Sequence, residues 1–306
     1  MIITDRLTPA MRDAVLRLQD DAVHHDEVGP LDEAALLALE HALAEPSDRA
    51  EEPRPRHLLA PADGPAGEAG SSLLGYASIL PDGTVQGMVD PAHRRRGIGS
   101  ALLEAALRER PDAAVWAHGG LTAALALLSA HGLEPVRTLL TLGRPLAGPA
   151  LVEEPASLAP LDLTTFEAAR DGEDWVALNA VAFADHPEQG RMTLADLRER
   201  VAQPWFRPDG FFLARHLDEL VGFVWTKHEA GSEDGEIYAV GTAPSAQGHG
   251  VARLLMVRAL AHLSAIGARR AVLYVEGDNA PALSVYRRLG FTTIGRDVQL
   301  RRGSLA

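Results

Sequence analysis

Residues 243–255 of the chain read APSAQGHGVARLL, in which two glycines stand directly before an apolar helical stretch. Residues 90–103, DPAHRRRGIGSALL, have the same form, and Gly97 precedes Gly250 by 250 − 97 = 153 positions. The first N–H groups of a helix have no intrahelical partner, and the helix dipole favours negative charge there. Glycine also lets a phosphate approach the backbone closely. One such turn is equally compatible with a plain helix start, but its repetition favours an anion site.

The elements predicted around the two turns follow the same order. In the first half we expect strands at 57–60, 72–80, 84–90, 113–117 and 135–145, and helices at 98–109 and 121–131. In the second half we expect strands at 210–216, 220–227, 235–241, 271–275 and 291–300, and helices at 250–266 and 280–289. The repeated order indicates an internal duplication. We predict a first domain over 1–146, a Pro- and Gly-rich linker over 147–160 and a second domain over 161–306.

Composition narrows the class of protein. The chain has 306 residues, of which 46% are hydrophobic, so it can form two cores of ordinary size. Its net charge of −13 argues against a nucleic-acid or acidic-membrane partner. It has no cysteine, and its histidines show no His-x-x-x-His pair, so we expect no metal site. With no signal-like or membrane-spanning stretch, we expect a cytoplasmic protein, and we expect a monomer.

Both turns resemble the Gln/Arg-x-x-Gly-x-Gly/Ala signature of the GCN5-related N-acetyltransferase (GNAT) family: Arg94-x-x-Gly97-x-Gly99 and Gln247-x-x-Gly250-x-Ala252. In that family the turn holds the pyrophosphate of acetyl-CoA, and the preceding strand contacts the pantetheine and the thioester. The resemblance implies an α/β (α+β) fold of two tandem GNAT domains, each a mixed, mostly antiparallel sheet flanked by helices. It implies that acetyl-CoA, as co-substrate, is bound by Gly87, Met88, Val89, Arg95, Arg96, Gly97, Ile98, Gly99 and Ser100 in the first half. In the second half it implies binding by Val240, Gly241, Thr242, Gln247, Gly248, His249, Gly250, Val251, Ala252, Arg253, Asn279, Ala280, Pro281, Ala282, Leu283 and Ser284.

The second half carries candidates for the chemistry of acetyl transfer. The amine must be neutral, the oxyanion needs a donor, and the leaving thiolate benefits from a proton. Glu236, on the strand before the turn, is the candidate base, and the Val240 N–H is the candidate oxyanion donor. Tyr286 matches the tyrosine that protonates the thiolate in many family members. The plainer alternatives are a solvated turn for Glu236 and a core position for Tyr286.

The first half lacks this pair. Alignment on Gly132 and Gly290 places Leu128 opposite Tyr286. Alignment on the two turns places Gly83 opposite Glu236. We therefore expect one catalytic domain, the second, and a first domain that binds acetyl-CoA without turning it over. A solvated basic turn is the alternative for Arg94–Arg96.

Several segments also resemble the mycothiol synthase family of actinobacterial tandem acetyltransferases, among them NAVAFADHPEQGRMT (179–193), GFVWTK (222–227) and LYVEGDNAPALSVYRRLGFTT (273–293). That family acetylates the cysteinyl amine of cysteinyl-glucosaminyl-inositol (Cys-GlcN-Ins). The resemblance implies an acceptor site made by Glu33, Glu188, Lys227, Glu236 and Tyr274. The alternatives are a strand-end surface charge for Lys227 and a helix-start acid for Glu33.

Two other functions stay open from the sequence. The first is a tandem acetyltransferase for another amine, such as an aminoglycoside or a protein N-terminus. The second is an acetyl-CoA-binding regulator without activity, against which the retained Glu236 and Tyr286 argue.

Overall fold

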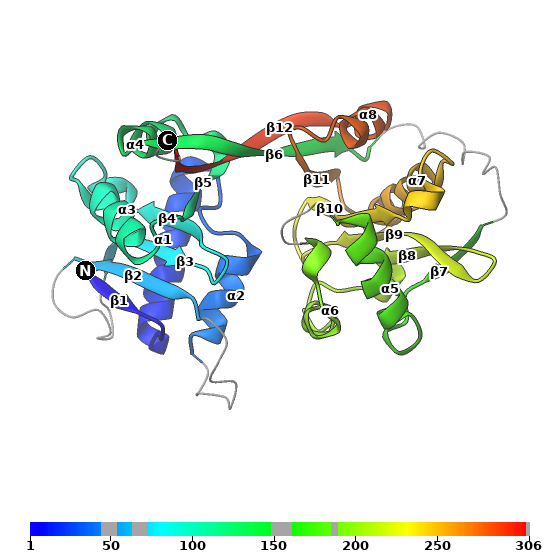
Figure 1. The fold of residues 1–306 in the computed structure, drawn as a ribbon, viewed down its shortest axis with the longest axis horizontal. Helices are drawn as coiled ribbons and strands as arrows, with labels where there is room; N and C mark the ends of the chain where they lie inside the picture. Colours follow the sequence, from blue (N-terminus) through cyan, green and yellow to red (C-terminus); the bar gives the residue numbers. More distant parts are fainter. Residues whose placement is uncertain (44–53, 63–71, 148–160, 185–188, 304–306) are drawn as a thin grey trace. The chain divides into compact units, whose positions relative to one another are not determined.

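The computed structural model describes residues 1–43, 54–62, 72–147, 161–184 and 189–303 (Figure 1). It forms two compact units. Unit 1 contains Met1–Leu140, Glu276–Asp278 and Gly295–Ala306, and unit 2 contains Thr141–Val275 and Asn279–Ile294. The units therefore differ from the predicted domain limits at the last strand of each half. Those limits stay a prediction about the duplicated sequence, and the predicted linker lies outside the described residues except for residue 147.

Unit 1 contains helices on both faces of a mixed sheet. Its strands are β1 (Ile2–Thr4), β2 (Arg56–Pro61), β3 (Leu73–Ile79), β4 (Thr84–Val89) and β5 (Ala114–Ala117), followed in the sheet order by parts of β12 (Thr292–Arg302) and β6 (Leu133–Pro145). Its helices are α1 (Pro9–Asp26), α2 (Glu33–His41), α3 (Ile98–Glu109) and α4 (Thr122–Ala130). Strand β4 runs parallel to β5. The pairs β1–β2, β2–β3, β3–β4 and β5–β12 are antiparallel.

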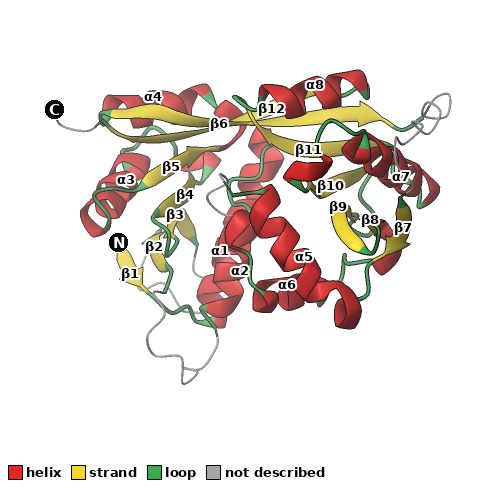
Figure 2. Cartoon of the chain, turned by 45° about the vertical axis from the view of Figure 1, so that its right-hand side comes forward, coloured by secondary structure: helices red, strands yellow, loops and turns green. Residues whose placement is uncertain are grey.

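Unit 2 repeats this plan. Its strands are β7 (Asp162–Thr165), β8 (Phe211–His216), β9 (Glu219–Lys227), β10 (Asp234–Thr242) and β11 (Arg270–Glu276). The remaining part of β6 follows β11 in the sheet order, and the remaining part of β12 follows β6. Its helices are α5 (Ala168–Ala182), α6 (Leu194–Val201), α7 (Val251–Ala265) and α8 (Ala280–Arg288) (Figure 2). Only the β10–β11 pair is parallel among the pairs β7–β8, β8–β9, β9–β10 and β10–β11. Both units thus have the mixed, mostly antiparallel sheets that the sequence predicted.

Alternation along β9 explains the layers of unit 2. Phe223 and Trp225 are fully buried and make edge contacts with Trp175 of α5, at ring separations of 5.3 and 5.8 Å. The neighbouring Gly222 faces α7, where a Cβ would lie 2.8 Å from the Val251 side chain. Because successive strand residues point to opposite faces, α5 and α7 cover the two sides of the sheet. Glycine at 222 lets the helix that follows the turn pack directly against the strand.

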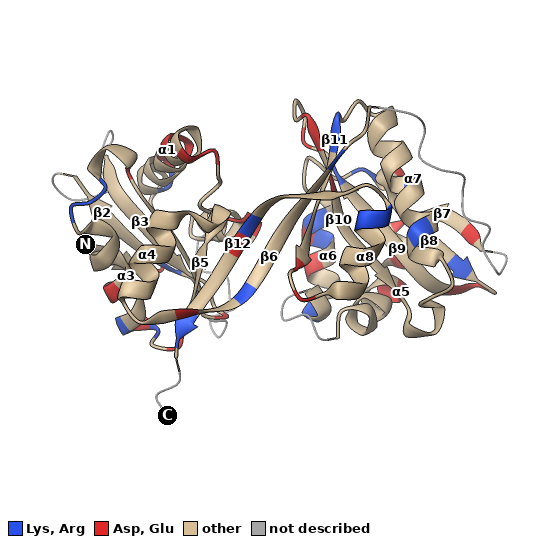
Figure 3. Cartoon of the chain, turned by 90° about the horizontal axis from the view of Figure 1, so that it is seen from above, with Lys and Arg blue, Asp and Glu red and all other residues tan. Residues whose placement is uncertain are grey.

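The predicted strands and helices of both repeats are confirmed, with ends that shift by at most a few residues. Asn279 is the N-cap of α8, and Gly267 follows the end of α7 with a φ of 95°, as expected for a C′ glycine. The sequence patterns did not predict β1, β7, α1, α2, α5 or α6. Acidic and basic residues are interspersed along the elements of each unit (Figure 3).

Candidate active site

The turn between β10 and α7 has the backbone geometry of an anion site. Gly248 and Gly250 have φ values of 77° and 83°, a conformation that favours glycine. A Cβ on either residue would meet no atom within 4 Å, so the turn is open on this side. Gly250 is the N-cap of α7, and no side chain caps the helix. The first N–H groups of α7 are therefore available to a phosphate.

Strands β10 and β11 separate just before this turn. They pair only from Asp234–Arg270 to Glu236–Val272, whereas β10 continues to pair with β9 as far as Thr242. In the described register, the edge of β10 that faces β11 is thus open over Val240, Gly241 and Thr242. This opening leads to the glycine turn, which is the arrangement needed by an extended ligand that ends in a phosphate.

Glu236 lies at the closed end of this opening. Its register partner on β9 is Lys227, and its neighbour on β11 is Val272. The Lys227 ammonium lies 5.0 Å from the centroid of the Trp205 ring and 3.2 Å from Glu229 Oε1. The structure therefore places two of the predicted acceptor-site residues, Glu236 and Lys227, side by side where the two strands divide.

Tyr286 lies on α8 of unit 2. Its side chain is 9% exposed and meets the edge of Phe291 at a ring separation of 6.0 Å. Burial raises the pKa of Tyr286 to about 12, so its phenol is neutral and carries a proton at physiological pH. Asn279 Oδ1 accepts a hydrogen bond from the Ala282 N–H at 3.1 Å. Its oxygen is therefore used to cap α8, and a contact from Asn279 to a thiol or pantetheine would use the amide nitrogen.

The corresponding turn of unit 1 is also open but is more basic. Gly97 has a φ of 82° with no atom within 4 Å of a Cβ position, and Arg95 adopts a positive φ of 63°. Arg94 makes a bidentate ion pair with Asp26 at the end of α1, with N–O distances of 2.8 and 2.6 Å. The Arg94 Nε also donates to the Val89 carbonyl at 3.2 Å. Arg94 thus fastens α1 to the end of β4, which leaves Arg95 and Arg96 as the basic side chains for an anion.

A cavity of about 660 Å³ extends from this turn into unit 1. It is lined at one end by the residues of the turn, including Arg94, Arg95 and Gly97–Ser100, and it continues between β4 and β5. Gly87, Met88 and Val89, the predicted strand contacts to acetyl-CoA, also line it. Leu128, which replaces Tyr286 here, is 4% exposed and forms part of the apolar wall.

One expected equivalence between the halves is wrong by one residue. In β10 the register shifts between Ile237 and Ala239, so Tyr238 is an extra, bulged residue. Strand β4 pairs with β3 without a shift from Val85 to Val89. When residues are counted back from the two turns and the bulged Tyr238 is left out, the residue that corresponds to Glu236 is Thr84 and not Gly83. The conclusion drawn from the alignment is unchanged, because Thr84 has no carboxylate and its hydroxyl donates to Asp82 at 2.8 Å.

The other three predicted acceptor residues lie on different parts of the chain. Glu33 is the first residue of α2 in unit 1, directly after the N-cap Asp32. Tyr274 lies on β11 of unit 2 and is 51% exposed. Glu188 lies outside the described residues. The acceptor roles of all three stay predictions.

Sequence reasoning missed a polar and aromatic group beside Glu236. The bulged Tyr238 accepts a hydrogen bond from Arg200 of α6 at 3.0 Å, and its ring lies 5.0 Å from those of Trp205 and Trp225. The alternation in EIYAV assigns Tyr238 to a face, but it cannot reveal the bulge. Asp26, the partner of Arg94, was missed for a similar reason, since its partner is 68 residues away.

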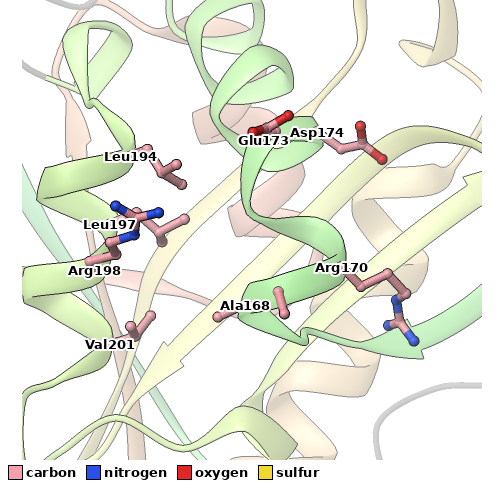
Figure 4. A pocket seen from close by; sticks show the side chains of 9 residues that line it. Ala168, Arg170, Glu173, Asp174, Leu194, Leu197, Arg198 and Val201 are labelled. Atoms are coloured by element: carbon pink, nitrogen blue, oxygen red, sulfur yellow. The ribbon is translucent and has the colours of Figure 1, made fainter.

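A second hollow, of about 330 Å³, lies between α5 and α6 (Figure 4). Arg170, Glu173, Asp174 and Arg198 contribute charges to it. Arg170 and Asp174 are engaged in an ion-pair network with the buried Asp171 and with Arg215. These pairs satisfy the buried carboxylate of Asp171, so we assign the network a structural role.

Among the described residues there is no group of three or more His, Asp or Glu side chains placed to hold a metal ion. Of the described helices, none combines the length and apolar character needed to cross a bilayer.

Comparison with known proteins identifies two copies of one family. The family model "Acetyltransferase (GNAT) family" matches residues 23–131 and 175–291. A mycothiol acetyltransferase of Brachybacterium faecium is 52% identical and covers 98% of each chain. A mycothiol acetyltransferase of Streptomyces bingchenggensis is 41% identical over 98% of this chain and 95% of its own. Among solved structures, a tandem GNAT protein from the clavulanic acid biosynthesis pathway superposes with a TM-score of 0.68 at 19% identity, over 97% of this chain and 96% of its own, which shows the shared fold.

Proposed function

The chain belongs to the acetyltransferase (GNAT) family, and we propose that its second half transfers acetyl from acetyl-CoA to the cysteinyl amine of Cys-GlcN-Ins to give mycothiol. The observation that carries this proposal is the likeness to mycothiol acetyltransferases at 41–52% identity over nearly the whole chain. The geometry of unit 2 supports it, because the open turn at Gly250 leads along β10 to Glu236, with the phenol of Tyr286 in the same unit.

In this proposal acetyl-CoA supplies the activated acetyl group. Its pyrophosphate lies on the Gln247–Arg253 turn, and its pantetheine extends along the open edge at Val240–Thr242. The acceptor amine loses a proton to Glu236, directly or through water. An α-amino group has an ordinary pKa of about 7.7–8.0, so a carboxylate has only a small proton burden to remove near neutral pH.

The neutral amine then attacks the thioester carbonyl. The Val240 N–H donates to the oxyanion of the tetrahedral intermediate, and the C–S bond breaks as the carbonyl re-forms. Tyr286 donates a hydrogen bond to the departing thiolate. The second proton on the attacking nitrogen passes to the thiolate, directly or through water, as the amide forms. The products are the N-acetyl compound and CoA, and the first amine proton is held by Glu236 until solvent removes it.

The first half has a different role in this proposal. Its turn at Gly97 binds a CoA thioester, but Thr84 and Leu128 in the places of Glu236 and Tyr286 leave it without a base or a proton donor. We therefore propose that unit 1 binds this ligand without transferring its acyl group.

The reaction is tested by mass spectrometry after the protein is mixed with acetyl-CoA and Cys-GlcN-Ins. Glucosaminyl-inositol without the cysteine and an aminoglycoside are the comparison acceptors. We expect a gain of one acetyl group on the cysteinyl compound alone. Acetylation of another amine in its place would refute the assigned acceptor, and no transfer to any acceptor would refute the enzymatic proposal.

A further inference from the structure

The cavity of unit 1 continues past the CoA turn into the apolar core beneath α3. Its closed end lies where β4 and β5 still pair, at Val85–Val115. The side chains around this end belong to one buried apolar cluster, and each is at most 6% exposed: Ala77, Val85, Val115, Ala117 and Leu128. An apolar ligand group that reached this end would be removed from water on all sides.

Equivalent positions in unit 2 carry larger side chains. The registers fix the equivalence, because Gly75–Val89 and Gly222–Thr242 are matching pairs, as are Thr84–Ala114 and Glu236–Val272. The five pairs, unit 1 first, are Ala77/Val224, Val85/Ile237, Val115/Leu273, Ala117/Val275 and Leu128/Tyr286. In every pair the residue of unit 1 is the smaller. The aliphatic exchanges alone remove about six methyl or methylene groups from the wall of unit 1.

Exchanges in the opposite direction also occur. Trp116 and Tyr76 replace the smaller Tyr274 and Phe223, and each belongs to the opposite face of its strand from Ala117 and Ala77. Ile98 and Leu127 of unit 1 are larger than their counterparts Val251 and Val285, and they lie beside the first turn of α3. There a Cβ at Gly99 would be only 3.1 Å from Leu127. Met88 replaces a glycine, but it packs in the separate cluster under α1. Relative to unit 2, the lining side chains of unit 1 are therefore larger beside the turn and smaller at Val85 and Val115.

We propose that unit 1 binds an acyl-CoA whose acyl group is a short aliphatic chain longer than acetyl, such as propionyl or butyryl. This inference rests on the proposed CoA-binding role of the Gly97 turn. The phosphates lie on that turn, the thioester lies along Gly87–Val89, and the acyl chain fills the closed end between Val85, Val115 and Leu128. Each buried methylene contributes about 0.8 kcal/mol, so the two additional methylenes of butyryl correspond to about 15-fold tighter binding than acetyl.

The test measures binding of CoA, acetyl-CoA and butyryl-CoA to the full chain by isothermal titration calorimetry. A Gly250→Val background disables the turn of unit 2, because a β-branched residue is strained at a φ of 83°. In this background we expect butyryl-CoA to bind about 15-fold tighter than acetyl-CoA. Ala117→Val, which restores the larger residue of unit 2, is expected to weaken butyryl-CoA about tenfold and to change acetyl-CoA less than twofold.

Ala101→Val on the exposed face of α3 is the matched control and is expected to change neither affinity. Val115→Leu is the second filling variant if Ala117→Val lowers the melting temperature. Equal or tighter binding of acetyl-CoA, an equal effect of Ala117→Val on both ligands, or no binding of any acyl-CoA in the Gly250→Val background would each overturn the inference. Acetyl transfer by the wild-type chain is measured separately. Its absence would refute the proposed reaction, whereas the preference for butyryl-CoA is decided by the binding measurements alone.

Discussion

The role of Tyr286 can be tested quantitatively by Tyr286→Phe. Burial raises the pKa of this phenol to about 12, whereas a thiol has an ordinary pKa of about 8.5. Complete proton transfer from Tyr286 to the leaving thiolate is then uphill by about 3–4 pKa units, on the order of 5 kcal/mol. We therefore expect the phenol to keep its proton and to stabilise the thiolate as a hydrogen-bond donor. A hydrogen bond to a charged group contributes about 1.5–3 kcal/mol, which predicts a 10- to 150-fold fall in kcat.

The assay follows release of free CoA thiol at saturating acetyl-CoA and acceptor, between pH 7 and 10. Because the phenol stays neutral throughout this range, we expect no loss of wild-type kcat that is attributable to Tyr286. Leu128→Met, a volume-conserving change at the corresponding position of unit 1, is the control and is expected to leave kcat unchanged. A fall below threefold would remove Tyr286 from the mechanism. A fall above about a thousandfold would refute the hydrogen-bond argument and indicate complete proton transfer.

Three further changes test other parts of the structure. Glu236→Gln is expected to lower kcat/KM by about 10²–10⁴ at pH 7, and a pH–rate profile should show the deficit shrinking above about pH 8, where the amine is already neutral. Asp26→Asn is expected to destabilise unit 1 by about 1–2 kcal/mol at pH 7 in urea unfolding. Hydrogen bonding from Arg94 lowers the pKa of Asp26, so this difference should be present above the ordinary pKa and lost as the pH falls through the lowered one. Asp297→Ala removes the acceptor of the Gly119 N–H at 2.7 Å, and faster amide exchange at 118–120 without a change in acetyl transfer is the expected result.

Local patterns in the sequence were sufficient for the elements that surround each turn. The glycine before an apolar run predicted α3 and α7, and both begin within a residue of the expected position. The two similar turns and the repeated order of strands and helices around them were sufficient to predict the duplication. These features depend on a few neighbouring residues, which is why composition and spacing could identify them.

The site itself was only partly predictable. The bulge at Tyr238 arises from pairing between β9 and β10, and the residues of β10 alternate as in a regular strand. The capping hydrogen bond of Asn279 limits how that residue can contact a ligand, and it appears only once α8 is formed. Glu236 and Tyr286 were assigned by resemblance to a family, because neither has a local sequence pattern that indicates catalysis.

The last strand shows most clearly where local reasoning ends. The sequence predicted a strand at 291–300, and we expected this strand to belong to the second domain. In the structure Val298, Gln299 and Leu300 of β12 pair with β5, and Asp297 accepts a hydrogen bond from Gly119, so this part of the strand belongs to unit 1. Alternation specifies which face of a strand is buried, but it does not specify the neighbouring strand. The last strand of the second half therefore pairs in part with a strand of the first half, and a fragment ending at residue 146 would leave the β5 edge of unit 1 without its strand.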